Sequence, residues 1–217
     1  MQGLKLRSNE YTGRLVVFEG TDGAGKTTLL TMAATSLRKR VGESGIICLK
    51  QPTDLSRKTK LFQKMMYSDN HEDIDYRAVQ LLTMSDRLQQ QYDTIVPALK
   101  NGKIVLCDRY IYTSLANMLA RGYRAENWFY EAASYLLKPD AAFLCYIEAA
   151  RAIERIKARP TECDRYLDEN LLRNVAVEFL FMSDREGLTV IRTDRPAEET
   201  FGRIQQELEQ KGIYDRA

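Results

Sequence analysis

The chain has 217 residues, the length of one α/β domain, and its 32 basic and 30 acidic side chains leave a net charge of +2. This balance removes the electrostatic reason to expect a nucleic-acid-binding protein, which usually carries a basic surplus. Hydrophobic residues make up 44% and charged residues 29% of the chain. Such a composition supports a packed core and excludes disorder as the main state.

The apolar runs and the cysteines further restrict the class of protein to which the chain can belong. No run approaches the ~20 residues that a membrane span requires, and residues 1–11 lack the apolar stretch of a signal peptide. Cys48, Cys107, Cys145 and Cys163 show no metal-binding spacing, and the first three lie in runs that predict buried strands. We therefore expect reduced thiols in a cytoplasmic protein with no membrane or nucleic-acid partner.

Short apolar runs alternate with helical periodicity along the chain. Strands are predicted at 14–19, 45–49, 103–107, 141–147 and 188–191. Helices are predicted at 26–41, at 74–100 with a kink or last turn at Pro97, at 110–137 with an interruption near Gly122, at 149–158 and at 197–211. A loop is predicted at 159–165. Uniformly apolar strands that alternate with helices are typical of a parallel sheet covered on both faces. We expect one α/β domain over residues 1–217 with a five-stranded, doubly wound parallel sheet.

A glycine-rich segment joins the first predicted strand to the first predicted helix. Residues 20–27, GTDGAGKT, match the pattern GxxxxGK[ST]. In this pattern backbone N–H groups wrap the phosphates, Lys26 reaches the β- and γ-phosphates, and the Thr27 hydroxyl binds Mg²⁺. A chance match between a strand and a helix is rare, so the segment predicts a nucleoside triphosphate site. The residues expected to bind ATP are Gly20, Asp22, Gly23, Ala24, Gly25, Lys26, Thr27 and Thr28.

Other P-loop classes carry additional motifs. A GTPase needs a base-reading N/T-K-x-D, whereas Thr59-Lys60 is followed here by Leu61-Phe62. An ABC-type ATPase needs a second glycine-rich signature, which the sequence lacks. With these two classes excluded, the sequence predicts a small phosphotransferase.

A second polar segment, Asp108-Arg109-Tyr110, follows the third predicted strand. Ligands of open α/β sheets bind at this end of the strands. Asp108 is expected to support Mg²⁺ together with Thr27, and Arg109 to clamp an acceptor phosphate with two hydrogen bonds. A surface ion pair is the alternative, and the upstream phosphate loop argues against it.

Taken together, these motifs resemble those of thymidylate kinases. The shared segments are 18–28, 108–110, Lys138-Pro139-Asp140, 154–159 and Asp164-Arg165. They occur in the family's order over nearly the whole chain. The resemblance implies a three-layer P-loop nucleoside monophosphate kinase fold with a helical lid at about 157–168. It also implies an enzyme that uses ATP and Mg²⁺, and a cytoplasmic homodimer.

The resemblance assigns roles by position. Asp22 matches the loop carboxylate near the acceptor's 3′-hydroxyl and the metal, and Arg87 the arginine that reads a pyrimidine carbonyl. Gly23 stands where some members carry a catalytic arginine, so the lid is expected to supply that group. The resulting catalytic candidates are Lys26, Arg109, Arg159 and Arg165. The acceptor-binding candidates are Asp22, Lys50, Arg87, Arg109, Ser114 and Asn117, and the metal-binding candidates are Thr27 and Asp108.

Two positions and one loop depart from the family's pattern. Thr83 stands where an aromatic side chain usually stacks on the base, and Asn117 where one usually packs against the deoxyribose. Residues 50–53, KQPT, replace an Arg-Glu-Pro-Gly-Gly-like loop. These changes affect thymine recognition and not phosphoryl transfer.

The acceptor is expected to be a phosphate. A nucleoside kinase needs a carboxylate base near the end of its second strand, and residues 49–52, LKQP, offer none. An ionised phosphate needs only positioning and charge neutralisation. The leading hypothesis is therefore a nucleoside monophosphate kinase that acts on dTMP. A related kinase for a modified nucleotide or another small phosphorylated acceptor is the alternative. A non-catalytic nucleotide-binding module is disfavoured by the presence of Lys26, Asp108 and the lid arginines.

Overall fold

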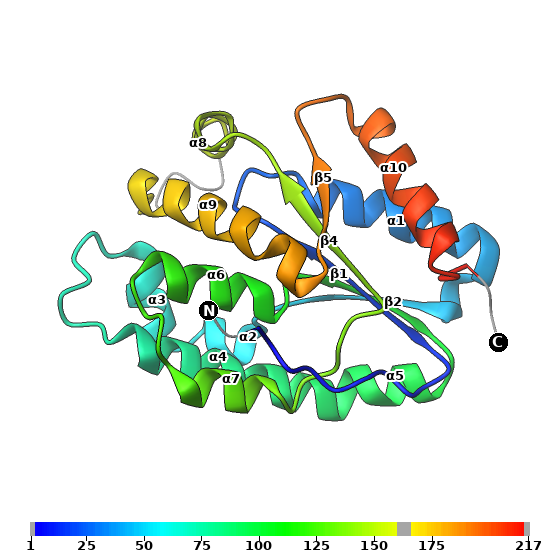
Figure 1. The fold of residues 1–217 in the computed structure, drawn as a ribbon, viewed down its shortest axis with the longest axis horizontal. Coiled ribbons are helices and arrows are strands. Elements are labelled where there is room, and N and C mark those ends of the chain that lie inside the picture. Colours follow the sequence, from blue (N-terminus) through cyan, green and yellow to red (C-terminus); the bar gives the residue numbers. More distant parts are fainter. Residues whose placement is uncertain (1–2, 160–165, 215–217) are drawn as a thin grey trace.

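A parallel sheet lies between two helical layers in the computed structural model, which describes residues 3–159 and 166–214 (Figure 1). Its strands are β1 (Arg14–Glu19), β2 (Ile46–Lys50), β3 (Ile104–Asp108), β4 (Ala141–Tyr146) and β5 (Thr189–Arg192). The α-helices are α1 (Lys26–Val41), α2 (Asp54–Arg57), α3 (Lys60–Tyr67), α4 (Tyr76–Gln90), α5 (Val96–Lys100), α6 (Ile111–Ala120), α7 (Asn127–Ala133), α8 (Ala149–Lys157), α9 (Glu169–Glu186) and α10 (Ala197–Gln210). A 3-10 turn, η1 (Glu43–Gly45), and a π-helical turn, η2 (Gln91–Ile95), complete the elements.

The strand order is β2-β3-β1-β4-β5, and every pairing is parallel. Alternate residues of the central strand β1 face opposite layers, as pleating requires. Leu15 and Val17 pack in the core that includes α4, α5, α6, α7 and α9, whereas Val16 and Phe18 pack in the core that includes α1, α8 and α10. The predicted doubly wound, three-layer fold is confirmed.

The chain leaves neighbouring strands β1 and β3 toward opposite layers, to α1 and α6 respectively. Where such a switch occurs, a crevice opens beyond the carboxyl ends of the two strands. The register brings these ends together, since Phe18 of β1 pairs with Asp108 of β3. The fold thus places the phosphate loop opposite Asp108 and Arg109.

The prediction of a buried second strand is wrong. β2 lies at one edge of the sheet and pairs only with β3, so Ile46 is its one buried residue. Cys48 is consequently exposed, whereas Cys107 and Cys145 on inner strands are buried as expected. Cys163 lies outside the described residues.

The prediction of one helix over 74–100 is confirmed, since α4, η2 and α5 follow one another without a break from Tyr76 to Lys100, with η2 as a π-helical turn inside the helix. Pro97 lies in the first turn of α5. It has no N–H, and its ring conflicts with the carbonyl group four residues earlier in a regular helix. The wider turn of η2 immediately before it accommodates both effects. The interruption predicted near Gly122 is confirmed by the break between α6 and α7.

Helices α2, α3 and α9 occupy segments for which no element was predicted. The 18-residue α9 has clear end signals: the Asp168 carboxylate accepts a hydrogen bond from Leu171 N at 2.9 Å, and Gly187 ends the helix in the left-handed conformation. Across 3–159 and 166–214, every helix is too short or too polar to cross a membrane.

Candidate active site

The phosphate loop between β1 and α1 requires glycine at two positions. Gly20 has a φ of 130°, and a Cβ atom there would lie 2.2 Å from the carbonyl oxygen of Cys145. Gly23 has a φ of 78°, and its Cβ would lie 2.4 Å from the carbonyl oxygen of Ala152. The close approach of α8 therefore excludes a side chain at the position where some family members carry an arginine.

Lys26 is buried at the start of α1, where its Nζ donates a hydrogen bond to the carbonyl oxygen of Thr21 at 2.7 Å. Burial, together with the positive charge of Arg109, lowers the pKa of Lys26 to about 8. The Lys26 ammonium thus points along the loop that would hold the phosphates.

Thr27 and Asp108 meet across the crevice, as the sequence predicted. The Thr27 hydroxyl donates to Asp108 Oδ2 at 2.9 Å. Asp108 Oδ1 is buried and has no hydrogen-bond partner among the described residues. Hydroxyl and carboxylate oxygens are ligands that Mg²⁺ prefers, and a buried oxygen without a partner needs such a ligand. The pair therefore fits a magnesium site.

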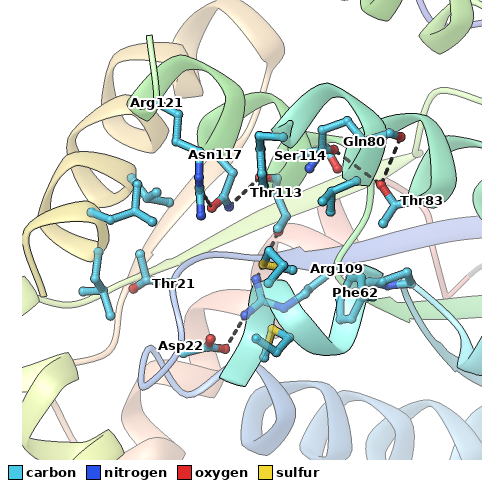
Figure 2. A pocket seen from close by; sticks show the side chains of 18 of the residues that line it. Thr21, Asp22, Phe62, Gln80, Thr83, Arg109, Thr113, Ser114, Asn117 and Arg121 are labelled. Atoms are coloured by element: carbon cyan, nitrogen blue, oxygen red, sulfur yellow. Dashed lines mark hydrogen bonds and ion pairs between the residues drawn. The ribbon is translucent and has the colours of Figure 1, made fainter. Parts of the chain in front are cut away.

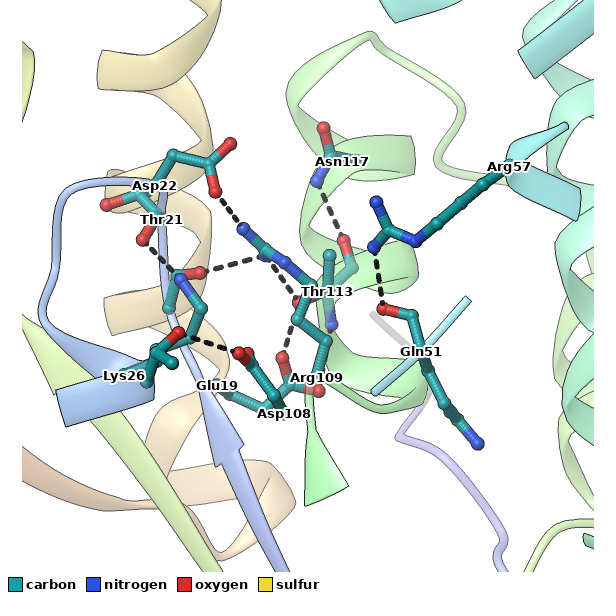
Figure 3. A network of polar contacts seen from close by, with 12 residues as sticks. Glu19, Thr21, Asp22, Lys26, Gln51, Arg57, Asp108, Arg109, Thr113 and Asn117 are labelled. Atoms are coloured by element: carbon teal, nitrogen blue, oxygen red, sulfur yellow. Dashed lines mark hydrogen bonds and ion pairs between the residues drawn. The ribbon is translucent and has the colours of Figure 1, made fainter. Parts of the chain in front are cut away.

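Arg109 reaches from the end of β3 into the crevice. Its backbone is left-handed, with a φ of 70°, a conformation that costs energy outside glycine and recurs at functional sites. Its guanidinium donates to Gly20 O at 3.0 Å, to Thr113 Oγ1 at 3.2 Å and to the Asp22 carboxylate (Figure 3). Burial opposes the charge, but the Asp22, Asp108 and Glu19 carboxylates together raise the pKa of Arg109.

A cavity of about 450 Å³ extends from the phosphate loop between α4 and α6 (Figure 2). It is lined by all six residues predicted to bind the acceptor: Asp22, Lys50, Arg87, Arg109, Ser114 and Asn117. Tyr166, Leu167 and Asp168, at the carboxyl end of the predicted lid, also line it. The predicted acceptor residues are therefore brought together in one place.

Arg87 lies deep in this cavity, 2% exposed. Its Nη1 donates to Thr83 O at 3.1 Å and its Nη2 to Tyr110 O at 3.3 Å, while Nε is buried without a partner among the described residues. Burial lowers the pKa of Arg87. The Thr83 side chain donates to Gln80 O at 3.2 Å and faces the cavity (Figure 2).

Asn117 is engaged by its own helix and by a second arginine. It donates to Thr113 O at 2.9 Å and accepts from Arg121 Nη1 at 2.8 Å. The Arg121 guanidinium lies 4.0 Å above the centre of the Tyr76 ring. Tyr76 and Arg121 thus form a cationic and aromatic wall of the cavity, which sequence reasoning missed.

Arg57 is a further cation that the sequence analysis missed. It ends α2, donates from Nε to Pro52 O at 2.7 Å and points toward Arg109 (Figure 3). Burial, together with the positive charge of Arg109, lowers the pKa of Arg57. In the sequence Arg57 lies five residues after Pro52, outside the motifs used to choose the candidate residues.

Arg155 and Arg159 lie in and just after α8. Arg155 of α8 donates to Gly23 O at 3.4 Å and to Thr193 O at 3.0 Å, so it joins the phosphate loop to the segment after β5. Arg159 is exposed just beyond α8. Arg165 lies outside the described residues.

A phosphate loop on one side of the crevice and an arginine-lined acceptor cavity on the other define a P-loop nucleoside monophosphate kinase, a phosphotransferase. The sequence model of the thymidylate kinase family matches residues 18–204. The chain belongs to the thymidylate kinase family.

Individual relatives agree with this assignment. A probable thymidylate kinase of Pyrococcus horikoshii is 36% identical over 177 residues, which cover 79% of this chain and 83% of the relative. A thymidylate kinase of Desulfotalea psychrophila is 33% identical over 172 residues, with 79% and 82% covered. The solved structure of the thymidylate kinase from Candida albicans superposes with a TM-score of 0.75 at 19% identity, covering 95% of this chain and 96% of that one. At that identity the structural likeness supports the fold.

Proposed function

We propose that this protein transfers the γ-phosphoryl group of ATP to the 5′-phosphate of dTMP in the cytoplasm, giving the diphosphate and ADP. The observation that carries the proposal is the pair of guanidinium groups, Arg57 and Arg109, which point toward each other beside the phosphate loop and line the cavity (Figure 3). Two cations at this point suit a phosphate dianion, which pairs with arginine through two parallel hydrogen bonds.

The donor side follows from the loop. Backbone N–H groups and the amino end of α1 would hold the ATP phosphates, and Lys26 would reach the β- and γ-phosphates. Thr27 and Asp108 would hold Mg²⁺, which when bound neutralises charge on the phosphates.

The acceptor side needs no general base. An ionised phosphate is already nucleophilic, so the chain's task is to position it in line with the γ-phosphate. Arg109 and Arg57 would hold the phosphate, and Asp22 would lie near the acceptor's 3′-hydroxyl. Charge on the transferring group would be neutralised by Lys26 and by a lid arginine, Arg159 or Arg165.

A second candidate acceptor is supported by the middle of the cavity. Arg87 suits a carbonyl group on the base, but Thr83 presents a hydroxyl instead of a ring. Asn117 and Arg121 add an amide and a cation. A more polar or modified nucleoside monophosphate would find hydrogen-bond partners there that dTMP does not use.

ADP release, measured with ATP and a panel of nucleoside monophosphates, tests these alternatives. The panel contains dTMP, dUMP, UMP, dCMP, dGMP and 5-hydroxymethyl-dUMP, each with its own kcat/KM. Turnover of dTMP supports the proposal, and a better pyrimidine competitor supports the polar-acceptor alternative. If the protein binds ATP but releases no ADP with any acceptor in the panel, a non-catalytic nucleotide-binding module would be favoured.

We also propose a homodimer. Leu81 of α4, Tyr92 of η2 and Tyr135 after α7 are large apolar side chains left exposed, and Tyr92 and Tyr135 are 79% and 58% exposed. Gln91 donates to Tyr135 O at 2.9 Å, so the two tyrosines belong to adjoining segments. Large exposed apolar patches commonly mark protein contacts.

Light scattering during gel filtration tests the dimer. We expect a mass twice that of the chain, reduced to one chain by Tyr92→Arg. Phe181→Arg on α9 is the matched control, since Phe181 is 78% exposed but lies on another helix. A monomeric wild-type protein would reject the dimer.

A further inference from the structure

Glu19 is the last residue of β1, and its carboxylate is fully buried, with 0% exposure. A buried carboxylate is costly unless hydrogen bonds or charges compensate it. Burial raises the pKa of Glu19. The residue precedes the phosphate loop, and the role proposed above for the loop makes no use of it.

Its hydrogen-bond partners all lie at the start of α6. Glu19 Oε1 accepts from Tyr110 N at 2.8 Å and from Thr113 N at 3.2 Å, and Oε2 accepts from the Thr113 hydroxyl. Tyr110, the residue before α6, provides no capping side chain. Glu19 therefore caps α6 from the neighbouring strand β1.

The Thr113 hydroxyl connects this carboxylate to Arg109. A hydroxyl has one proton, and Thr113 gives it to Glu19, so that the oxygen's lone pairs remain for other donors. Arg109 Nη1 donates to that oxygen at 3.2 Å. The series of hydrogen bonds from Arg109 to Thr113 and from Thr113 to Glu19, called the relay below, thus sets the direction of each bond (Figure 3). It also holds one edge of the Arg109 guanidinium in place.

We propose that Glu19 is a positioning residue for the acceptor phosphate, acting through Thr113 to hold the Arg109 guanidinium. The proposal rests on the function proposed above for Arg109. Glu19 does not touch the phosphate. It supplies a negative charge and a fixed acceptor for the Thr113 hydroxyl, which adds a third contact to those that Arg109 makes with Gly20 and Asp22.

Conservative substitutions test this relay. Glu19→Gln keeps the size but removes the charge, and its amide would donate to Thr113 instead of accepting. Thr113→Val removes the hydroxyl, and Thr113→Ser retains it. We expect Glu19→Gln and Thr113→Val each to raise the KM for the nucleoside monophosphate about tenfold, the effect of one hydrogen bond to a charged group. The KM for ATP should not change, and Thr113→Ser should behave as wild type.

A double variant and a matched control distinguish loss of the relay from a general loss of structure. Because the two residues act through one chain, Glu19→Gln with Thr113→Val should lose no more than the worse single variant. Thr35→Val is the control, since Thr35 bonds the carbonyl four residues earlier in α1, away from the site. It should leave both KM values unchanged. Melting temperatures of all variants report the capping role separately.

A readout without turnover keeps the relay distinct from the proposed function. In ¹⁵N spectra, rotation of the Arg109 guanidinium should be slow in the wild type and Thr113→Ser. It should be measurably faster in Glu19→Gln and Thr113→Val, in which the contacts with Gly20 and Asp22 remain but the oriented contact with Thr113 is lost. Wild-type protein inactive with every nucleoside monophosphate would reject the proposed function and not the relay. Unchanged Arg109 signals with an unchanged acceptor KM, or losses that multiply in the double variant, would overturn the relay and leave Glu19 as a helix cap.

Discussion

We expect phosphoryl transfer to depend strongly on the Lys26 side chain. Lys26→Ala should lower kcat by roughly 10²–10³-fold, the loss seen when a charge-stabilising group is removed from a transition state. Its melting temperature should stay close to wild type, because Nζ contacts a loop carbonyl and not the core. Near-normal turnover by a folded Lys26→Ala protein would contradict the kinase mechanism.

The lowered pKa of Lys26 gives this prediction a pH dependence. The free enzyme loses the ammonium charge as the pH rises through about 8, so kcat/KM for ATP should fall above that pH. The free energy of unfolding should change with pH in the opposite direction. Between about 8 and the ordinary value of 10.5 the unfolded chain binds more protons than the folded one, so unfolding free energy should rise with pH there. Lys26→Arg keeps its charge and should lack both changes.

Arg57 is expected to contribute to acceptor binding and not to ATP binding. Arg57→Ala should raise the acceptor KM about tenfold, as expected for losing one charged hydrogen bond. Lys58→Ala is the control, because Lys58 is its exposed neighbour and pairs with Asp54. Steady-state kinetics with each substrate varied in turn measure the two KM values. Equal changes in the acceptor KM of the two variants would exclude a phosphate-binding role for Arg57.

Thr83 tests the choice of acceptor. Base–aromatic stacking is worth ~1–3 kcal/mol, or about 5–150-fold in affinity. We expect wild-type protein to phosphorylate dTMP with a high KM and to use another nucleotide as well or better. Thr83→Phe should then shift kcat/KM toward dTMP. A micromolar KM for dTMP in the wild type, with no competing acceptor, would show that the departures from the family pattern have no effect on acceptor choice.

At the scale of elements, the phosphate loop is fixed by its packing against β4. Gly20→Ala would place a Cβ 2.2 Å from a β4 carbonyl oxygen and should destabilise the protein by more than about 2 kcal/mol. Gly187→Ala is the control: it is also left-handed, but no atom lies within 4 Å of its Cβ. It should cost only about 1 kcal/mol. Urea unfolding compares them, and equal losses would mean that backbone conformation alone requires glycine at position 20.

At the scale of the whole molecule, we propose that the segment between α8 and α9 brings a cation to the transferring group. Its described end already crosses the cavity, since the Tyr166 ring meets the His71 ring edge-on at 5.6 Å. A supplied arginine is worth roughly 10³–10⁵-fold in related reactions. Arg159→Ala or Arg165→Ala should therefore lower kcat far more than it raises the acceptor KM. Wild-type kcat in both single variants and in the double variant would overturn the lid assignment.

Local sequence patterns determined the class of the protein. Each of the decisive patterns spans only a few residues, because backbone geometry and hydrophobic periodicity act over short distances. These patterns are the phosphate loop with its flanking strand and helix, and Asp108-Arg109 after β3. Strands that alternate with helices then restricted the sheet to a parallel one. For this reason the fold, and the grouping of the phosphate-loop residues and the predicted acceptor residues around one crevice, could be inferred before any contact was known.

Only the tertiary structure decided which further side chains meet there. Glu19 and Thr113 are 94 residues apart, and Arg109 reaches Asp22 over 87. Such pairs depend on strand order and register, which no local period encodes. The same order left β2 at the sheet edge and exposed Cys48, although its run is as apolar as an inner strand. Arg57 joined the site for the same reason: its short helix lies where β2 ends, next to β3, whose end carries Arg109.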